Sequence, residues 1–250
     1  MTTPETCSVR HLLRLGLIAS VVTVLLGELP IGWAAYPAVP GDPGGMLGML
    51  IGSAGLSMWQ LALGTLFGGI GIPLQYFGFE GAARIVGASG NKKSARLMHW
   101  GAMATAGLGG IVHVICIGLM FVCKCVDLSG MTGLSSIPQP VMDFALWLVM
   151  PISIVFMPVY YAMCVALFVA VVRGKTCLPR WAAVLNPLTA TLVINALPML
   201  LPASPAVNAL GMANMGIGSV VTFAGLLALL PSSLSQGEGS PSGRAGTEGD

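Results

Sequence analysis

Charged side chains are scarce in this sequence. Only 8% of the residues are charged and 55% are hydrophobic, whereas a soluble domain carries roughly 25% charged residues. Such a chain cannot cover its surface with ionised groups, so most of that surface has to face lipid. The net charge of +2 is also too small for a nucleic-acid-binding surface. We therefore expect the lipid bilayer as a partner, and no nucleic acid.

Familiar motifs of enzymes and metalloproteins are also missing. The six cysteines form no Cys-x-x-Cys pair with histidines at the spacing of a zinc site. There is no Gly-rich phosphate loop, no serine-hydrolase elbow and no zinc-protease helix motif. We therefore expect neither a metal nor a cofactor, and these absences leave open whether the protein is an enzyme.

Long stretches without charge predict the membrane spans. Residues 97–123 and 144–172 form two such stretches of 27 and 29 residues, and a spanning helix needs about 20 apolar residues. Residues 181–237 give 57 residues without charge, enough for two spans. A proline-rich turn divides this third stretch into expected helices near 181–201 and 206–230.

The N-terminal half requires a finer division. Residues 12–33 are apolar apart from Arg14 and Glu28, and the Pro- and Gly-rich stretch that follows them predicts a loop over 34–45. We expect residues 46–56 to form a short helix lying along the outer interface, and 58–84 to form the second span. An alternative is that the first 35 residues are a cleaved signal peptide, although this apolar run is longer than a usual signal core.

The distribution of basic residues predicts the orientation of the spans. With six spans, Lys124 alone lies on one side and ten basic residues lie on the other, and cytoplasmic loops carry the excess of Lys and Arg. The ten are Arg10, Arg14, Arg84, Lys92, Lys93, Arg96, Arg173, Lys175, Arg180 and Arg244. We therefore expect a multi-pass protein of the plasma membrane with both termini in the cytoplasm.

Taken together, these patterns predict an all-α membrane protein. Residues 1–230 should form a single domain, a bundle of six transmembrane helices with a short interfacial helix after the first outer loop. Residues 231–250 are rich in Ser, Gly and Pro, and we expect a disordered cytoplasmic tail there. The oligomeric state is left open.

Polar residues recur at one depth in the expected spans. Glu28, His113, Asn195 and Asn214 each lie 14 to 16 residues from the inner boundary of their span, which corresponds to about 21–24 Å along a helix. Tyr160 on the fourth span comes close to the same layer. Polar groups in the membrane are costly and often functional, so these five residues are our candidate ligand-binding site. The alternative is that they only hydrogen-bond neighbouring helices together.

A short motif resembles that of a known family. Residues 174–188 contain Pro179-Arg180-Trp181 followed by Asn186-Pro187. This stretch is similar to a signature of a family of multi-pass bacterial membrane proteins without an established activity. The resemblance implies the multi-pass fold and no particular chemistry. Physically, Arg180 and Trp181 should anchor the helix at the inner interface.

Three functions remain open from the sequence. The first is binding or transport of a small polar or amphiphilic compound at the polar layer. The second is an intramembrane enzyme in which Glu28 and His113 act as acid and base on a lipid-like substrate. The third is a structural or assembly protein without a ligand.

Overall fold

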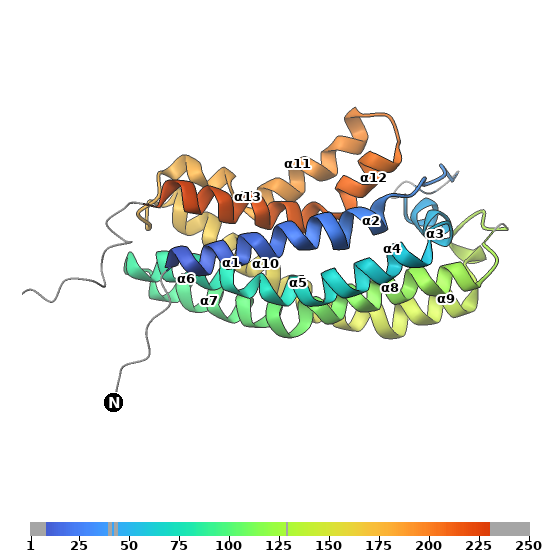
Figure 1. Cartoon of the computed structure of the whole chain (residues 1–250), viewed down its shortest axis with the longest axis horizontal. Helices are drawn as coiled ribbons and strands as arrows, with labels where there is room; N and C mark the ends of the chain where they lie inside the picture. The colour runs from blue at the N-terminus through green and yellow to red at the C-terminus, as the bar shows by residue number, and fades with distance from the viewer. Residues whose placement is uncertain (1–8, 40–41, 43–44, 129, 231–250) are drawn as a thin grey trace, which may run out of the picture.

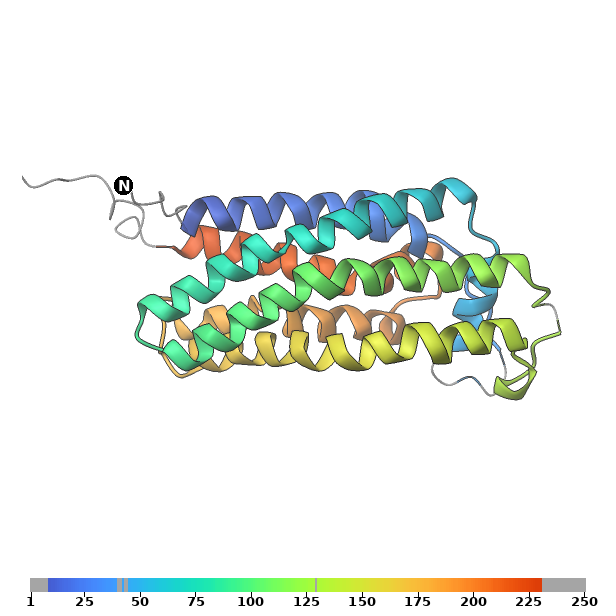
Figure 2. The same cartoon turned by 90° about the horizontal axis from the view of Figure 1, so that it is seen from below.

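The chain folds into a bundle of long helices that run roughly along one axis (Figures 1 and 2). The computed structural model describes residues 9–39, 42, 45–128 and 130–230, and these contain helices and no strand. Three long helical runs come first: α1 (Val9–Val22), η1 (Thr23–Glu28) and α2 (Leu29–Gly32); α4 (Met58–Leu63), η2 (Gly64–Gly68), α5 (Gly69–Leu74) and α6 (Tyr76–Ala88); and α7 (Lys92–Ala104), η3 (Thr105–Gly109) and α8 (Gly110–Cys125).

The fourth long run and the shorter elements complete the bundle. The fourth run consists of α9 (Gln139–Phe144), η5 (Ala145–Val149) and α10 (Met150–Val172). The shorter elements are α3 (Met46–Ala54), η4 (Leu134–Ser136), η6 (Arg180–Val184), α11 (Pro187–Leu200), α12 (Pro205–Met212) and α13 (Asn214–Leu229). The expected tail over 231–250 lies outside the described residues.

Four helices are long and apolar enough to cross a membrane. They cover Val9–Gly32, Met58–Ala88, Lys92–Cys125 and Gln139–Val172. The pair α12 and α13, bent by 64° at Ala213, brings the number of candidate spans to five if it counts as one span. The all-helical membrane fold is thus supported, whereas the expected number of six spans is not confirmed.

The helix expected over 181–201 is shorter than the sequence suggested. Its first residues form the 3₁₀ turn η6, and α11 begins only at Pro187. The reason is local: Asn186 Oδ1 accepts a hydrogen bond from the backbone N–H of Leu188, and Pro187 has no N–H to continue a preceding helix. The 14 residues of α11 span about 21 Å, less than the roughly 30 Å thickness of a hydrocarbon core.

Each of the four long helices contains one π turn, which the sequence analysis did not predict. These turns are η1, η2, η3 and η5. A π turn inserts an extra residue into the helix, changes the direction of the side chains that follow, and often occurs at functional sites. In the first helix, Pro30 follows η1 closely and removes a backbone donor, which favours such a break.

Glycines allow the first two long helices to pack closely. A Cβ atom at Gly16 would overlap the backbone of Gly78, and one at Gly78 would overlap the ring of Phe223 on α13. The first helix therefore packs directly on the second and the last. It also carries fully buried residues such as Leu13, so the segment considered above as a signal peptide is an integral part of this bundle.

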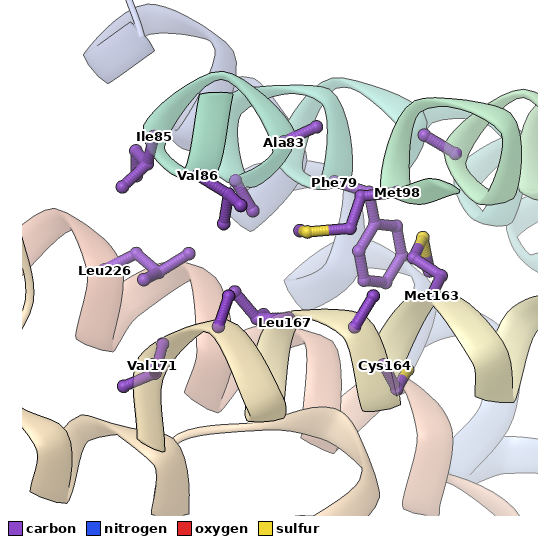
Figure 3. Close-up of a cluster of buried hydrophobic side chains, with 14 of the residues drawn as sticks. Phe79, Ala83, Ile85, Val86, Met98, Met163, Cys164, Leu167, Val171 and Leu226 are labelled. Atoms are coloured by element: carbon purple, nitrogen blue, oxygen red, sulfur yellow. The ribbon is translucent and has the colours of Figure 1, made fainter. Parts of the chain in front are cut away.

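Figure 3 shows part of the largest of three hydrophobic clusters in the described chain. Phe79 of α6, Met98 of α7 and Met163 of α10 meet there, and all three are at most 1% exposed. One end of the bundle holds the start of α1 and the end of α13, because Arg10 Nη2 donates a hydrogen bond to the carbonyl oxygen of Leu230 at 2.8 Å. Apart from Lys124, the Lys and Arg residues of the described chain belong to the segments that meet here. We call it the basic end.

Candidate functional site

A cavity of about 300 Å³ lies between the four long helices and the bend from α12 to α13. All four long helices and both sides of the bend contribute to its wall, whereas α11 does not. The wall is mainly apolar and includes the side chains of Ile31, Ile72, Val112, Ile117, Phe156 and four methionines. Glu28, His113, Tyr160 and Asn214 line it as well, and we refer to it as the Glu28 cavity.

Glu28 is positioned by the π turn η1, of which it is the last residue. Its side chain extends to α13, where a Cβ atom at Gly216 would overlap Oε2. Neither carboxyl oxygen forms a hydrogen bond or an ion pair with a described residue, although Glu28 is only 6% exposed. The missing Cβ of Gly216 leaves room for Oε2, which is buried and has no partner in the described chain, and the residue as a whole lines the cavity.

His113 lies on α8, one turn after the π turn η3. Its ring packs against the second long helix, where a Cβ atom at Gly68 would overlap Nε2. This nitrogen is buried and has no hydrogen-bond partner among the described residues. Gly68 therefore makes room for the imidazole, and the backbone of Gly64 lies near the ring without giving Nε2 a bond of hydrogen-bonding geometry.

Tyr160 closes the cavity on the side of α10. Its ring lies 5.8 Å from that of Phe156 and 6.0 Å from that of Phe79, centroid to centroid. Its hydroxyl group is near the side chains of Ser219 and Cys164 but meets neither in hydrogen-bonding geometry. Of the six buried side-chain polar atoms that lack a partner in the described chain, three thus belong to residues lining this one cavity.

The two asparagines have different places. Asn214 is the first residue of α13 and lines the cavity at the bend. Asn195 on α11 does not line it; its Oδ1 accepts a hydrogen bond from Asn214 Nδ2 at 2.9 Å. The bend is stabilised by Asn208, whose Nδ2 donates to the carbonyl oxygen of Ala34 at 2.7 Å and joins α12 to the end of the first helix.

Other polar residues of the wall were missed by the sequence analysis. Gln75, between α5 and α6, is 4% exposed and accepts a hydrogen bond from the hydroxyl group of Ser219 at 3.1 Å. Thr105 of η3 also lines the cavity and donates to the carbonyl oxygen of Gly101. A polar residue inside an expected span is itself a signal, but Gln75 lies nearer the inner boundary than the layer on which the sequence analysis concentrated.

The structure places Glu28 and His113 in the same cavity wall but does not pair them. In the part of the chain that the structure describes, no hydrogen bond or ion pair joins the two side chains. They are separate contact points around a shared space. Such an arrangement can hold a ligand from several sides, whereas proton exchange between the two residues would need a bridging molecule.

The remaining sequence predictions concern the basic end. Arg180 and Trp181 lie in η6 and are exposed, so their role as interface anchors stays a prediction. Within the described residues, no group of three or more His, Cys, Asp or Glu side chains could hold a metal ion.

Comparison with known proteins gives one match. No curated protein and no solved structure matches the chain. A family described as a family of unknown function (DUF6796) matches residues 2–233, nearly the whole chain. The chain therefore belongs to the DUF6796 family.

Proposed function

We propose that the protein binds a small polar or amphiphilic compound in the Glu28 cavity. The observation that carries this proposal is that Glu28, His113 and Tyr160, from three different helices, line one apolar cavity and each has a buried polar atom without a partner. Leaving such a group unsatisfied costs about 1–3 kcal/mol. Mainly apolar cavities with a few convergent polar groups are typical ligand sites.

Hydrogen bonding between helices does not account for these three residues. Residues that only hold helices together bond to one another across the interface. The pair Asn195 and Asn214 does so, at 2.9 Å. Glu28 has no such bond in the described chain, and neither do Nε2 of His113 and the hydroxyl group of Tyr160. A bound molecule would give these groups a partner.

Gly211 offers a direct test of the cavity. It lines the cavity, and a Cβ atom there would meet no atom within 4 Å, so Gly211→Leu should fill the space without disturbing the backbone. Gly107→Leu is the matched control, because Gly107 is equally unobstructed and does not line the cavity. Native mass spectrometry of the purified proteins would then identify small molecules that co-purify.

We expect the wild type and Gly107→Leu to carry the same compound and Gly211→Leu to lose it. If Gly211→Leu retains the compound at the same occupancy, the molecule binds elsewhere and the proposal is wrong. If the wild type carries nothing except bulk lipid and detergent, a structural or assembly role without a ligand is favoured instead.

An intramembrane enzyme is the second candidate. It is favoured by the presence of an acid and a histidine, Glu28 and His113, in one cavity wall. Incubating the purified protein with the co-purified compound and measuring its mass over time separates the two functions. A new product that is absent with Glu28→Gln would indicate catalysis, and an unchanged mass would indicate binding or transport.

For the membrane arrangement, we propose six crossings in the plasma membrane with both termini in the cytoplasm. The concentration of Lys and Arg at the basic end supports this orientation. In this arrangement α11 would cross together with η6 and residues 201–204, because α11 alone is too short. The helix α3 would lie along the outer interface.

A further inference from the structure

The charges around the Glu28 cavity are one-sided. Glu28 is the only acidic residue of the wall, and no Lys or Arg lines it. An ionised carboxylate in such surroundings costs several kcal/mol unless a positive group compensates it. No such group contacts it, because Glu28 has no ion pair in the described chain and His113 of the same wall does not bond to it. An anionic ligand would meet no cation of Lys or Arg here, whereas a cationic ligand would meet the carboxylate of Glu28.

The aromatic side chains of the same cavity wall also suit a cation. Phe156 and Tyr160 line the cavity with ring centroids 5.8 Å apart, inclined at 38°. Aromatic faces attract ammonium groups, and this attraction is strongest where water is excluded. Glu28 and the two rings therefore provide a charge partner and an aromatic surface from different helices.

The rest of the wall suits an apolar body. Met120, Met157, Met212 and Met215 contribute flexible and polarisable thioether groups, which adapt to apolar ligands of irregular shape. The volume of about 300 Å³ is large for a bare ion, and no group of acidic, His or Cys side chains in the described chain could hold a metal. Size and lining thus favour an organic molecule.

We infer that the ligand of the Glu28 cavity is a small ammonium compound with an apolar body. Its N–H groups donate to the carboxylate of Glu28, the charge lies against Phe156 and Tyr160, and the apolar body packs among the four methionines. This inference rests on the proposed function, because it names the ligand class of the same cavity.

The experiment compares three probes of equal chain length, namely octylamine, octanol and octanoate. Radiolabelled octylamine is titrated onto the full-length protein in an uncharged detergent, with empty micelles as background, and the other probes compete for it. The variants are Glu28→Gln and, as a matched control, Glu80→Gln, which removes a buried glutamate outside the cavity.

We expect octylamine to bind saturably and at least about tenfold more tightly than octanol, because a buried charge pair contributes at least that much. Octanoate should not compete. Glu28→Gln should abolish the preference for the amine and leave the affinity for octanol unchanged, and Glu80→Gln should keep the preference.

Several results would overturn the inference. Equal binding of octanol and octylamine, with both lost in Gly211→Leu, would reject the ammonium head group and leave the proposed function intact. Stronger competition by octanoate, or a preference for the amine that survives in Glu28→Gln, would also reject it. Absence of saturable octylamine binding would reject it too, and the co-purification experiment would then decide the proposed function by itself.

Discussion

Glu80 and Glu28 are both buried in the bundle, at 9% and 6% exposure, but they have different neighbours. Toward the basic end, Glu80 Oε1 lies 3.0 Å from Arg84 Nε, and its Oε2 lies 2.8 Å from His99 Nδ1 on the next helix. The carboxylate thus joins α6 to α7 with both oxygens satisfied. Glu28 has neither a cation nor a hydrogen-bond donor among the described residues.

The difference separates a structural acid from a candidate functional one. Phe79 and Ala83, close to Glu80 in the sequence, belong to a dense core (Figure 3), and both oxygens of Glu80 have partners within the protein. Around Glu28 the helices are interrupted by π turns and a bend, and three residues of the cavity wall each have a buried polar atom that lacks a partner in the described chain. A protein retains such an unsatisfied region at a cost in stability, which is why we assign the ligand to it.

The largest expected effect concerns the two ends of the bundle. Reporter fusions after residues 90, 176 and 235 should all score as cytoplasmic, and fusions near 40, 130 and 204 as external. The physical reason is the retention of Lys and Arg on the cytoplasmic side. A cytoplasmic score near residue 130 would contradict the six-span arrangement.

Gly78→Val should abolish folding. Its side chain would overlap the ring of Phe223, and the backbone of Gly16 already lies against Gly78 without room for another atom. Size-exclusion chromatography in detergent should show aggregation or loss of the protein. Gly107→Val is the control, since nothing lies within 4 Å of a Cβ there, and its elution profile should remain that of the wild type.

Glu80→Gln should lower the free energy of unfolding by about 1–2 kcal/mol, since it removes a carboxylate that bonds to two partners. The value is modest because the side chains of Arg84 and His99 are 41% and 45% exposed, so water screens the pair. Denaturant titration in mixed micelles, followed by tryptophan fluorescence, measures it. An unchanged midpoint would show that this acid is not structural.

Asn195→Leu should lower the free energy of unfolding by about 0.6 kcal/mol, the typical contribution of a hydrogen bond between membrane helices. It removes the acceptor of the Asn214 amide. Since Asn195 does not line the cavity, the co-purified compound should be retained. Loss of that compound with unchanged stability would instead place Asn195 in the binding site.

The smallest expected effect on stability is that of Glu28→Gln, less than about 0.5 kcal/mol, because no ion pair is lost. Ligand binding should nevertheless fall. His113→Ala should lower both ligand binding and the free energy of unfolding, because it also removes a ring that packs against Gly68. If Glu28→Gln unfolds the protein as readily as Glu80→Gln does, the contrast between the two acids fails.

Much of this architecture follows from the sequence. A membrane span needs an apolar helix, so the stretches without charge predicted the positions of the long helices. Glu80 and Arg84 are four residues apart, a spacing that favours an ion pair on one helix face, and their Oε1 and Nε atoms lie 3.0 Å apart. Counting residues from the inner boundary of each span placed Glu28, His113 and Asn214 in one expected layer. All three residues line the cavity. Their role as ligand-binding residues stays a prediction.

Other features depend on contacts between residues far apart in the sequence. The π turns, the bend at Ala213 and the place of Gln75 in the cavity wall were not predicted. The bond between His99 and Glu80 joins two helices and was not predicted either. Asn195 bonds to Asn214 but lies on a helix that does not line the cavity.

The physical reason is that the depth of a side chain in the membrane and the rotation of its helix are determined by different features of the chain. The rise per residue of a helix is nearly constant, so counting residues determines how deep a side chain lies. The direction in which it points depends on the rotation of each helix about its axis. That rotation is decided by close contacts such as those of Gly16 with Gly78 and of Gly216 with Glu28, which form only when the helices pack together.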